Sequence, residues 1–397
     1  MIIWLLTALL VGILIGIFTG LFPGIHINLV GTFLVTLSAS LLYKIPAIYL
    51  VTFIASMAIT HTFVDFIPSI FLGCPDTDTE LSILPGHEML KEGEGYQAVM
   101  RTAYGGLISS FFLVFLAFPL AFFVSKVYPS LQKVMPFILI LVCITMIFSE
   151  KKKFLAFISL SLTGILGLCV LNMNLKEPLL PLLSGLFGSS MLLISINQNT
   201  KIPRQNLNFK KLKFKQFIKP ISGAIISSPL CGFLPGLGGG QAAVIGNQIV
   251  KTDEKDFLIL LGAVNVLVMG LSFVSLYSIS KTRTGAAVAI QSLIGNMNTN
   301  VLILILCVCL ISGIISFFLV KIIAAKFLKI IEKINYKKLS IIIITVLSSL
   351  ILLISGIVGF AVFIISTATG IYCINLNVRK TQMMGCLLIP TIILYLL

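Results

Sequence analysis

Two short stretches interrupt apolar sequence with a Pro-Gly break that is followed by polar side chains. The first is GLFPGIHINL at residues 20 to 29, and the second is GFLPGLGGGQ at residues 232 to 241. A helix that begins after such a break presents free backbone N–H groups, which carry partial positive charge. In an apolar medium those groups need a partner, so the break is tolerated only beside protein or a water-filled cavity. Both breaks are therefore predicted to bind an anion such as a carboxylate or phosphate.

The residues predicted to contact this substrate are the breaks themselves and the polar residues after them. The three consecutive glycines of the second copy let backbone approach a ligand closely. The alternative is that the glycines serve tight helix packing and the prolines only kink two helices. The set is Pro23, Gly24, His26, Asn28, Pro235, Gly236, Gly238, Gly239, Gly240 and Gln241.

Acidic residues near the first break form a second candidate site, for a coupling cation. Asp65 lies within an apolar run, where an ionisable group costs several kcal/mol unless it is paired or hydrated. The stretch PDTDTE places Asp76, Asp78 and Glu80 at alternate positions, and hard oxygen ligands at that density suit Na⁺ or Ca²⁺, although no named calcium motif is present. The alternatives are a structural pairing of Asp65 with His61, one helical turn away, and a solvated acidic turn at 76–80.

The stretch SISKTRTGAAVAI occupies the corresponding position in the second half of the chain. Two cations alternate with two threonines there, namely Lys281, Thr282, Arg283 and Thr284. Charge and hydroxyl donors together suit an anionic group, so these residues join the predicted substrate site. The alternative is a pair of interfacial cations that fix the depth of a helix in the membrane.

The elements that must position these residues are membrane helices. Of the 397 residues 58% are hydrophobic and only 10% are charged, and the mean hydropathy is +1.12. The apolar runs are continuous rather than alternating, which excludes a β-barrel and predicts an all-α polytopic, multi-pass protein of the cell membrane. The first segment lacks a basic region and is expected to remain in the mature protein. The cysteines are expected to be packing residues, because no pair has zinc or redox spacing.

The basic residues predict the topology. The net charge of +15 is carried by loops beside apolar runs, which favours a positive-inside membrane protein over a nucleic-acid partner. If each break lies at the tip of a re-entrant hairpin and the cluster Lys151 to Lys153 lies in the cytoplasm, 22 Lys and Arg fall inside and 6 outside, with both termini outside. The chain then divides into a first repeat (1–200), a basic cytoplasmic linker (201–217) and a second repeat of opposite orientation (218–397). Each repeat is a hairpin followed by about five transmembrane helices, the plan of many secondary transporters.

Several stretches together resemble the large membrane subunit (TctA) of tripartite tricarboxylate transporters, in particular its shorter archaeal branch. They are GIFTGLFPGI, GCPDTDTELSILPGHEMLKEGEGYQAVMRTAYGG, GFLPGLGGGQAA and KTRTGAAVAI, which span residues 12 to 290. The resemblance implies a permease in which two Pro-Gly regions flank an anionic substrate and an ion gradient drives transport. It also implies a periplasmic binding protein and a small membrane subunit as partners.

The functional prediction is a secondary transporter for a small organic anion, coupled to Na⁺ or H⁺. No cofactor, metal site or enzymatic activity is expected, because nucleotide, hydrolase and metal motifs are absent from the sequence. The alternative is a translocase for a polyprenyl phosphate or another anionic lipid, since re-entrant hairpins with flanking cations also suit a phosphate head group. An intramembrane enzyme is a third hypothesis, but its polar residues are too sparse to name a mechanism.

Overall fold

The computed structural model describes residues 2–22, 45–73, 78–197, 203–208, 212–234, 237–331 and 336–396. All regular secondary structure in these ranges is helical. Eight of the described helices are long and apolar enough to cross a membrane. The prediction of an all-α polytopic membrane protein is therefore confirmed.

The helices of the first half occupy residues 2 to 197. They are α1 (Ile2–Leu21), α3 (Ala47–Val64), α4 (Phe66–Leu72), η1 (Glu80–Ser82), α5 (Ile83–Lys91), α6 (Gly95–Phe148), α7 (Lys153–Leu171), α8 (Leu179–Leu183), η2 (Ser184–Ser189) and α9 (Ser190–Asn197). The predicted first hairpin, with Pro23, Gly24, His26 and Asn28, lies outside the described residues.

The helices of the second half begin inside the stretch that the sequence predicts as a linker. They are α10 (Phe214–Phe233), α11 (Gly239–Val250), α12 (Glu254–Ile279), α13 (Gly285–Ile294), α14 (Thr299–Ile331), α15 (Tyr336–Asn375), η3 (Lys380–Met384) and α16 (Gly385–Leu396). Helices α10 and α11 are the two arms predicted for the second hairpin.

The two halves follow the same order of elements. Helix α3 begins at Ala47 and α12 begins 207 residues later at Glu254, while α5 begins at Ile83 and α13 begins 202 residues later at Gly285. The packing repeats as well, because α1 packs on α3 as α10 packs on α12, and α14 packs on α3 as α6 packs on α12. This correspondence supports an internal repeat, while the opposite orientation of its halves stays a prediction.

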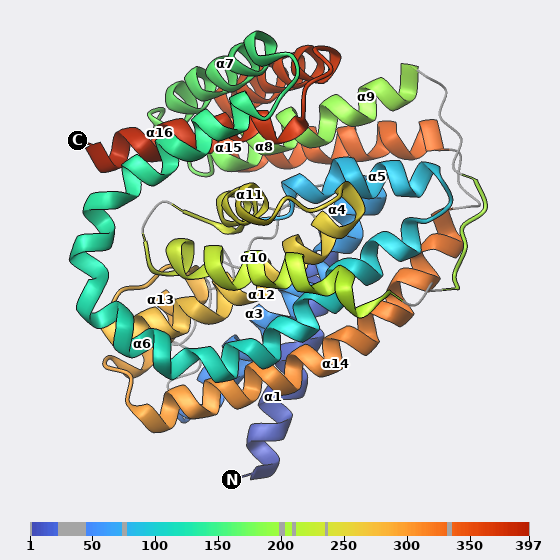
Figure 1. Cartoon of the computed structure of the whole chain (residues 1–397). Coiled ribbons are helices and arrows are strands. Elements are labelled where there is room, and N and C mark those ends of the chain that lie inside the picture. The colour runs from blue at the N-terminus through green and yellow to red at the C-terminus, as the bar shows by residue number, and fades with distance from the viewer. Residues whose placement is uncertain are drawn as a thin grey trace.

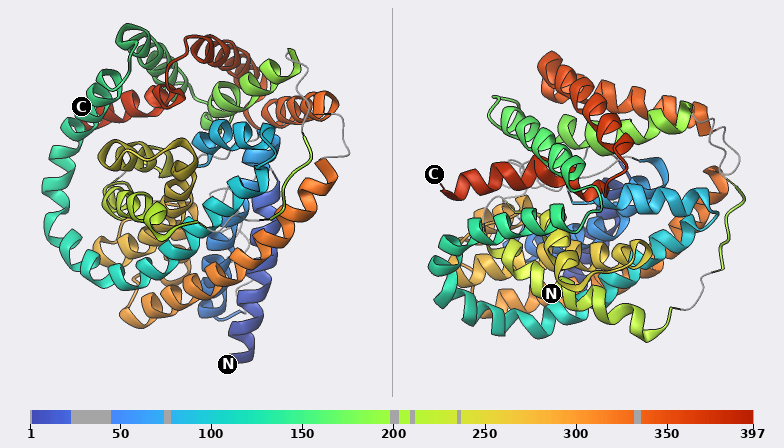
Figure 2. Two further views of the ribbon diagram at one scale, coloured as in Figure 1. Left: turned by 45° about the vertical axis from the view of Figure 1, so that its right-hand side comes forward. Right: turned by 45° about the horizontal axis from the view of Figure 1, so that its top comes forward.

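Figures 1 and 2 show two layers joined by α6. One layer holds α7, α8, α9, α15 and α16, and the other holds α1, α3, α10, α12, α13 and α14, with α11 and α5 between them. The sequence predicts two separate spans at 102–125 and 134–149, but the structure has one long helix there. Three prolines inside α6 remove backbone N–H donors and allow it to curve from one layer to the other, namely Pro119, Pro129 and Pro136.

Reciprocal glycines bring α6 and α12 together. A Cβ on Gly105 would overlap the backbone of Ile259, and a Cβ on Gly262 would overlap the backbone of Thr102. Small residues at such positions let helix backbones approach, which is how membrane helices gain dispersion contacts without a hydrophobic driving force. The same contact carries a buried ion pair between Arg101 and Asp256.

The α6–α12 contact predicts that Gly262→Ala destabilises the protein. The added methyl group meets a backbone carbonyl that cannot move independently, so a loss of about 2–3 kcal/mol or failure to fold is expected. Thermal unfolding of the detergent-solubilised protein measures the effect. Gly223→Ala is the matched control, because its Cβ would first meet the side-chain ends of Val250 and Leu260. Equal melting temperatures for the two variants would contradict the role of this contact.

Candidate functional site

The N-terminus of α11 is capped by a carboxylate from the other half of the chain. The backbone N–H of Gly239 donates to Asp78 Oδ1 at 2.6 Å, and the N–H of Gly238 donates to Gln241 Oε1 at 2.9 Å. A negative charge is favourable at this end of a helix because of the partial positive charge of the free N–H groups. Asp78 therefore joins the predicted acidic site to the second predicted break.

Glu80 packs against the next residue of the same helix end. Its side chain is fully buried, and a Cβ on Gly240 would overlap its carboxylate and press on the terminal methyl group of Met384. Only glycine at position 240 lets the carboxylate lie this close to the backbone. The glycine run thus admits two acidic side chains to the start of α11.

Asp65 lies at the junction of α3 and α4, where it contacts the second half of the chain. Its Oδ2 accepts a hydrogen bond from Asn265 Nδ2 at 3.0 Å, and the same amide nitrogen lies 3.2 Å from the carbonyl oxygen of Thr62. The His61 ring contacts Thr19 Oγ1 at 3.1 Å. The structure therefore gives Asp65 an interhelical amide contact, while its pairing with His61 stays an alternative.

Paired hydroxyl groups align the polar segment before η1 with the polar segment before α13. Ser69 Oγ and Thr79 Oγ1 lie 2.6 Å apart, and Ser272 Oγ and Thr284 Oγ1 lie 2.9 Å apart. Each threonine directly precedes a short helix, η1 in the first half and α13 in the second. The residue before each threonine therefore occupies a matching place, and these two residues are Asp78 and Arg283.

Arg283 extends toward aromatic hydroxyl groups. Its Nη2 donates to Tyr128 Oη at 2.8 Å, and its guanidinium carbon lies 5.8 Å from the centre of that ring. Tyr395 of α16 lies near enough to interact electrostatically with both side chains. Lys281 is exposed, and Ser275 Oγ donates to its carbonyl oxygen at 3.0 Å.

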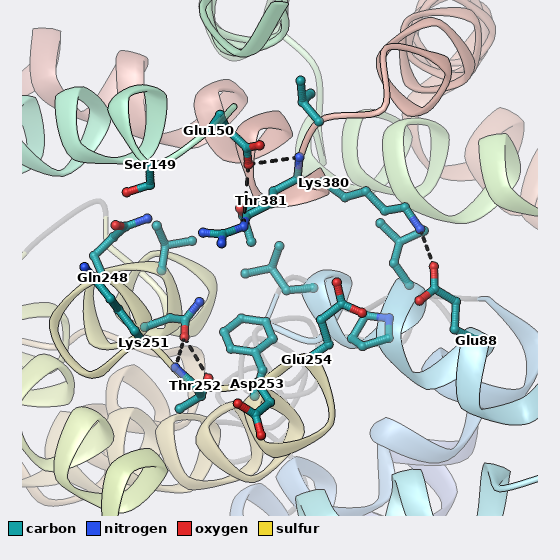
Figure 3. Close-up of a pocket in the computed structure, with 18 of the residues that line it drawn as sticks. Glu88, Ser149, Glu150, Gln248, Lys251, Thr252, Asp253, Glu254, Lys380 and Thr381 are labelled. Atoms are coloured by element: carbon teal, nitrogen blue, oxygen red, sulfur yellow. Dashed lines mark hydrogen bonds and ion pairs between the residues drawn. The ribbon is translucent and has the colours of Figure 1, made fainter. Parts of the chain in front are cut away.

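A cavity of about 910 Å³ lies beside the C-terminal part of α11. Figure 3 shows Glu150 and Thr381 on one wall and Lys251 and Asp253 across from them. Val244, one helical turn after Gln241, also lines the cavity. Helix α11 therefore extends from the Asp78 contact at its first turn to the cavity at its other end.

Ion pairs at the cavity connect elements that lie far apart in the sequence. Glu88 of α5 pairs with Lys380 at 2.9 Å, and Glu150 after α6 pairs with Arg379 at 3.6 Å. These pairs are partly exposed, so each contributes little stability on its own. They nevertheless fix the segment before α16 as one wall of the cavity.

Comparison with known proteins gives the family. Residues 6–385 match the tripartite tricarboxylate transporter TctA family. The chain belongs to this family. It is also 32% identical over 358 residues to an uncharacterized protein of the archaeon Methanocaldococcus jannaschii, a match that covers 87% of this chain and 88% of that protein. No solved structure matches the chain.

Membership of the TctA family confirms the resemblance drawn from the sequence and the multi-pass membrane location. In the described part of this TctA-family chain, the predicted residues fall into three places. Gly238, Gly239, Gly240 and Gln241 meet Asp78 and Glu80, whereas Asp65 lies with Asn265, and Lys281, Thr282, Arg283 and Thr284 form the connection into α13. The predicted residues outside the described ranges are Pro23, Gly24, His26, Asn28, Asp76, Pro235 and Gly236.

Three residues that interact with the predicted ones are missing from the sequence-based prediction. Asn265 is detectable in principle, because it is a polar residue inside the apolar run 257–279. Tyr128 and Tyr395 carry no such signal, because aromatic residues are common where membrane helices meet the interface. Only the packing of α6 and α16 brings them to Arg283.

The capping contact predicts that Asp78→Ala destabilises the protein by about 1–2 kcal/mol, because a carboxylate is lost from a helix N-terminus. Thermal unfolding in detergent measures the change. Asp253→Ala is the matched control, since that exposed residue precedes α12 without capping it through its side chain. A loss for Asp78→Ala no larger than that for the control would show that the contact does not stabilise α11.

His87 in the short helix α5 predicts a loss of stability in acid. Burial, followed by the charge of Lys91, lowers the pKa of His87 to about 4 from 6.5. Between these values the unfolded chain binds a proton that the folded protein excludes, so the contribution of His87 to stability is constant above pH 6.5 and falls as the pH drops toward 4. Thermal unfolding at a series of pH values measures the slope. His87→Gln should flatten this slope, and an unchanged slope would assign the acid sensitivity to other groups.

Proposed function

We propose that the protein is a secondary transporter for a small organic anion such as a carboxylate, driven by a gradient of Na⁺ or H⁺. The observation that carries this proposal is the position of α11, whose first turn meets charged side chains from the other half and whose last turns line the cavity. A transport site at the junction of two repeats, formed by a broken helix, has this arrangement. Membership of the TctA family supports the same conclusion.

The proposed substrate site lies between the two Pro-Gly breaks and beside the connection into α13. In the described residues it comprises the start of α11, with Gly238, Gly239, Gly240 and Gln241, together with the stretch from Lys281 to Thr284. Glycines allow close approach, and the two cations neutralise the charge of the substrate. The first break, at residues 20 to 28, is proposed to contribute to the same site, because the predicted repeat pairs it with the second break.

The proposed coupling site is acidic and consists, within the described residues, of Asp65 with Asp78 and Glu80; Asp76 is the fourth proposed member. A carboxylate among apolar helices is costly unless it is neutralised, so binding of a proton or Na⁺ there changes the energy of the surrounding contacts. Asp65 is suited to this role because its carboxylate reaches Asn265 in the other half, at 3.0 Å. A change in its charge would act directly on the contact between α3 and α12.

The family description also supports protein partners. A tripartite transporter includes further components, so we propose an extracytoplasmic binding protein and a small membrane subunit as partners. The lipid bilayer surrounds the long apolar helices. The absence of enzymatic activity remains an expectation.

The test is uptake of labelled citrate, succinate and phosphate into proteoliposomes that contain the full chain, under an inward Na⁺ or H⁺ gradient. We expect carboxylate accumulation that stops when the gradient is dissipated. Asp65→Asn should reduce this accumulation about tenfold or more, because the titratable charge is lost. Glu177→Gln is the control, because it also removes a negative charge but lies outside the cavity lining and outside the proposed site.

Two results would overturn the proposal. One is carboxylate uptake that does not depend on either gradient, and the other is full gradient-driven uptake by Asp65→Asn. A parallel assay of fluorescent polyprenyl phosphate scrambling tests the lipid alternative, and activity in that assay alone would replace the anion transporter.

A further inference from the structure

The two matched connections have opposite charges, which divides the proposed substrate site into unequal halves. The Ser69–Thr79 contact in the first half matches the Ser272–Thr284 contact in the second half. In this alignment Asp78 and Arg283 occupy corresponding positions of the two halves. An anionic substrate would be repelled at the first place and attracted at the second. The following inference rests on the proposed function and specifies which side chain takes the charge of the substrate.

At the start of α11 the protein already supplies its own anion. Asp78 accepts from the Gly239 N–H at 2.6 Å, and Glu80 is buried against Gly240. A second carboxylate brought to this helix end would meet two acidic side chains at short range. The N-terminus of α11 is therefore unsuited to hold the charged group of a carboxylate, although its glycines can still form a wall of the site.

At the matching place, one edge of the Arg283 guanidinium is only partly used. Nη2 donates to Tyr128 Oη at 2.8 Å, whereas Nε is buried and has no hydrogen-bond acceptor among the described residues. A buried donor without an acceptor is uncommon in proteins because it forfeits its hydration. Nε and Nη2 lie on the same edge of the planar group, which is the edge that binds a carboxylate through two parallel hydrogen bonds.

We infer that Arg283 binds a substrate carboxylate through its Nε–Nη2 edge, and that Tyr128 is a positioning residue whose hydroxyl group occupies Nη2 until the substrate replaces it. The carboxylate gives Nε the acceptor that it lacks. At Nη2 it replaces the neutral hydroxyl group of Tyr128 with a charged acceptor. Such charge-assisted bonds are about twice as strong as neutral ones. The Tyr395 hydroxyl lies near enough to contribute to the electrostatic environment of the bound group.

The ring of Tyr128 also explains how Arg283 is held ready for this exchange. The guanidinium carbon lies 5.8 Å from the ring centre, within the range of a cation–π contact. That contact survives when the hydroxyl group is displaced, so the guanidinium keeps its place while its acceptor changes. Lys281, two residues earlier and exposed, attracts the anion from solvent without forming part of the paired edge.

The experiment measures binding of citrate, succinate and inorganic phosphate to the purified full chain in detergent by isothermal titration calorimetry. Arg283→Gln should weaken carboxylate binding more than about tenfold, and Arg283→Lys should not restore it, because an ammonium lacks the planar edge. Tyr128→Phe keeps the ring but removes the competing hydroxyl, so binding should become roughly threefold tighter. Lys126→Gln is the matched control, because this exposed cation lies on the same helix as Tyr128; its binding should stay within about twofold of wild type.

Three outcomes test the guanidinium edge, the Tyr128 hydroxyl group and the class of substrate in turn. Wild-type affinity in Arg283→Gln, or full affinity in Arg283→Lys, would overturn the role of the guanidinium edge. Weaker binding by Tyr128→Phe would show that its hydroxyl is a substrate ligand rather than a displaceable partner. Arg283-dependent binding of phosphate in preference to both carboxylates would overturn the assignment of a carboxylate.

Folding and the proposed function are tested separately from this inference. Gel filtration and melting temperature without ligand establish that each variant folds, and Tyr128→Phe provides a readout if Arg283→Gln does not fold. If the wild-type protein neither binds nor transports a carboxylate, the proposed function fails. If the wild-type protein does both and the Arg283 variants are unchanged, only the assignment to Arg283 fails.

Discussion

The hydrogen bond from Gly239 to Asp78 is the contact on which the arrangement of the site depends. A helix that begins inside a membrane protein exposes N–H groups that no water can satisfy cheaply, so the break before α11 requires a partner. The partner comes from the first half of the chain, 161 positions away in the sequence. This contact fixes the start of α11 beside η1 and α5, and the cavity forms between the later turns of α11 and the same α5.

Close helix packing also joins the two halves of the chain. The backbones of α6 and α12 approach through Gly105 and Gly262, and the buried pair of Arg101 and Asp256 crosses the same interface. A buried ion pair adds little net stability, because desolvation of its charges offsets their attraction. Its directional hydrogen bond instead favours one alignment of the two helices. Related contacts recur in the other layer, where Gly167 packs against Cys386 and Gly370 packs against Leu186.

The two connections aligned by their serine–threonine contacts differ in charge. One serine–threonine contact lies directly before η1 and another directly before α13, while Asp78 and Arg283 beside them differ in the sign of their charge. An acidic side chain at one place attracts cations, and a guanidinium at the other attracts anions. This difference is the physical basis on which the proposed transporter would bind two oppositely charged solutes.

The sequence alone determined the class of fold and much of the candidate set. Its continuous apolar runs dictate membrane helices, because only helices satisfy their own backbone there, and the second Pro-Gly break marks the boundary between α10 and α11. Other features needed the tertiary structure. The prolines of α6 are compatible with two short helices or one curved helix, and packing against both layers selected the curved one. The partners of Asp65 and Arg283, which are Asn265 and Tyr128, lie 200 and 155 positions away, and no local pattern encodes such pairings. Residue types therefore determined which groups need partners in an apolar interior, whereas the packing of distant helices decided which partners they have.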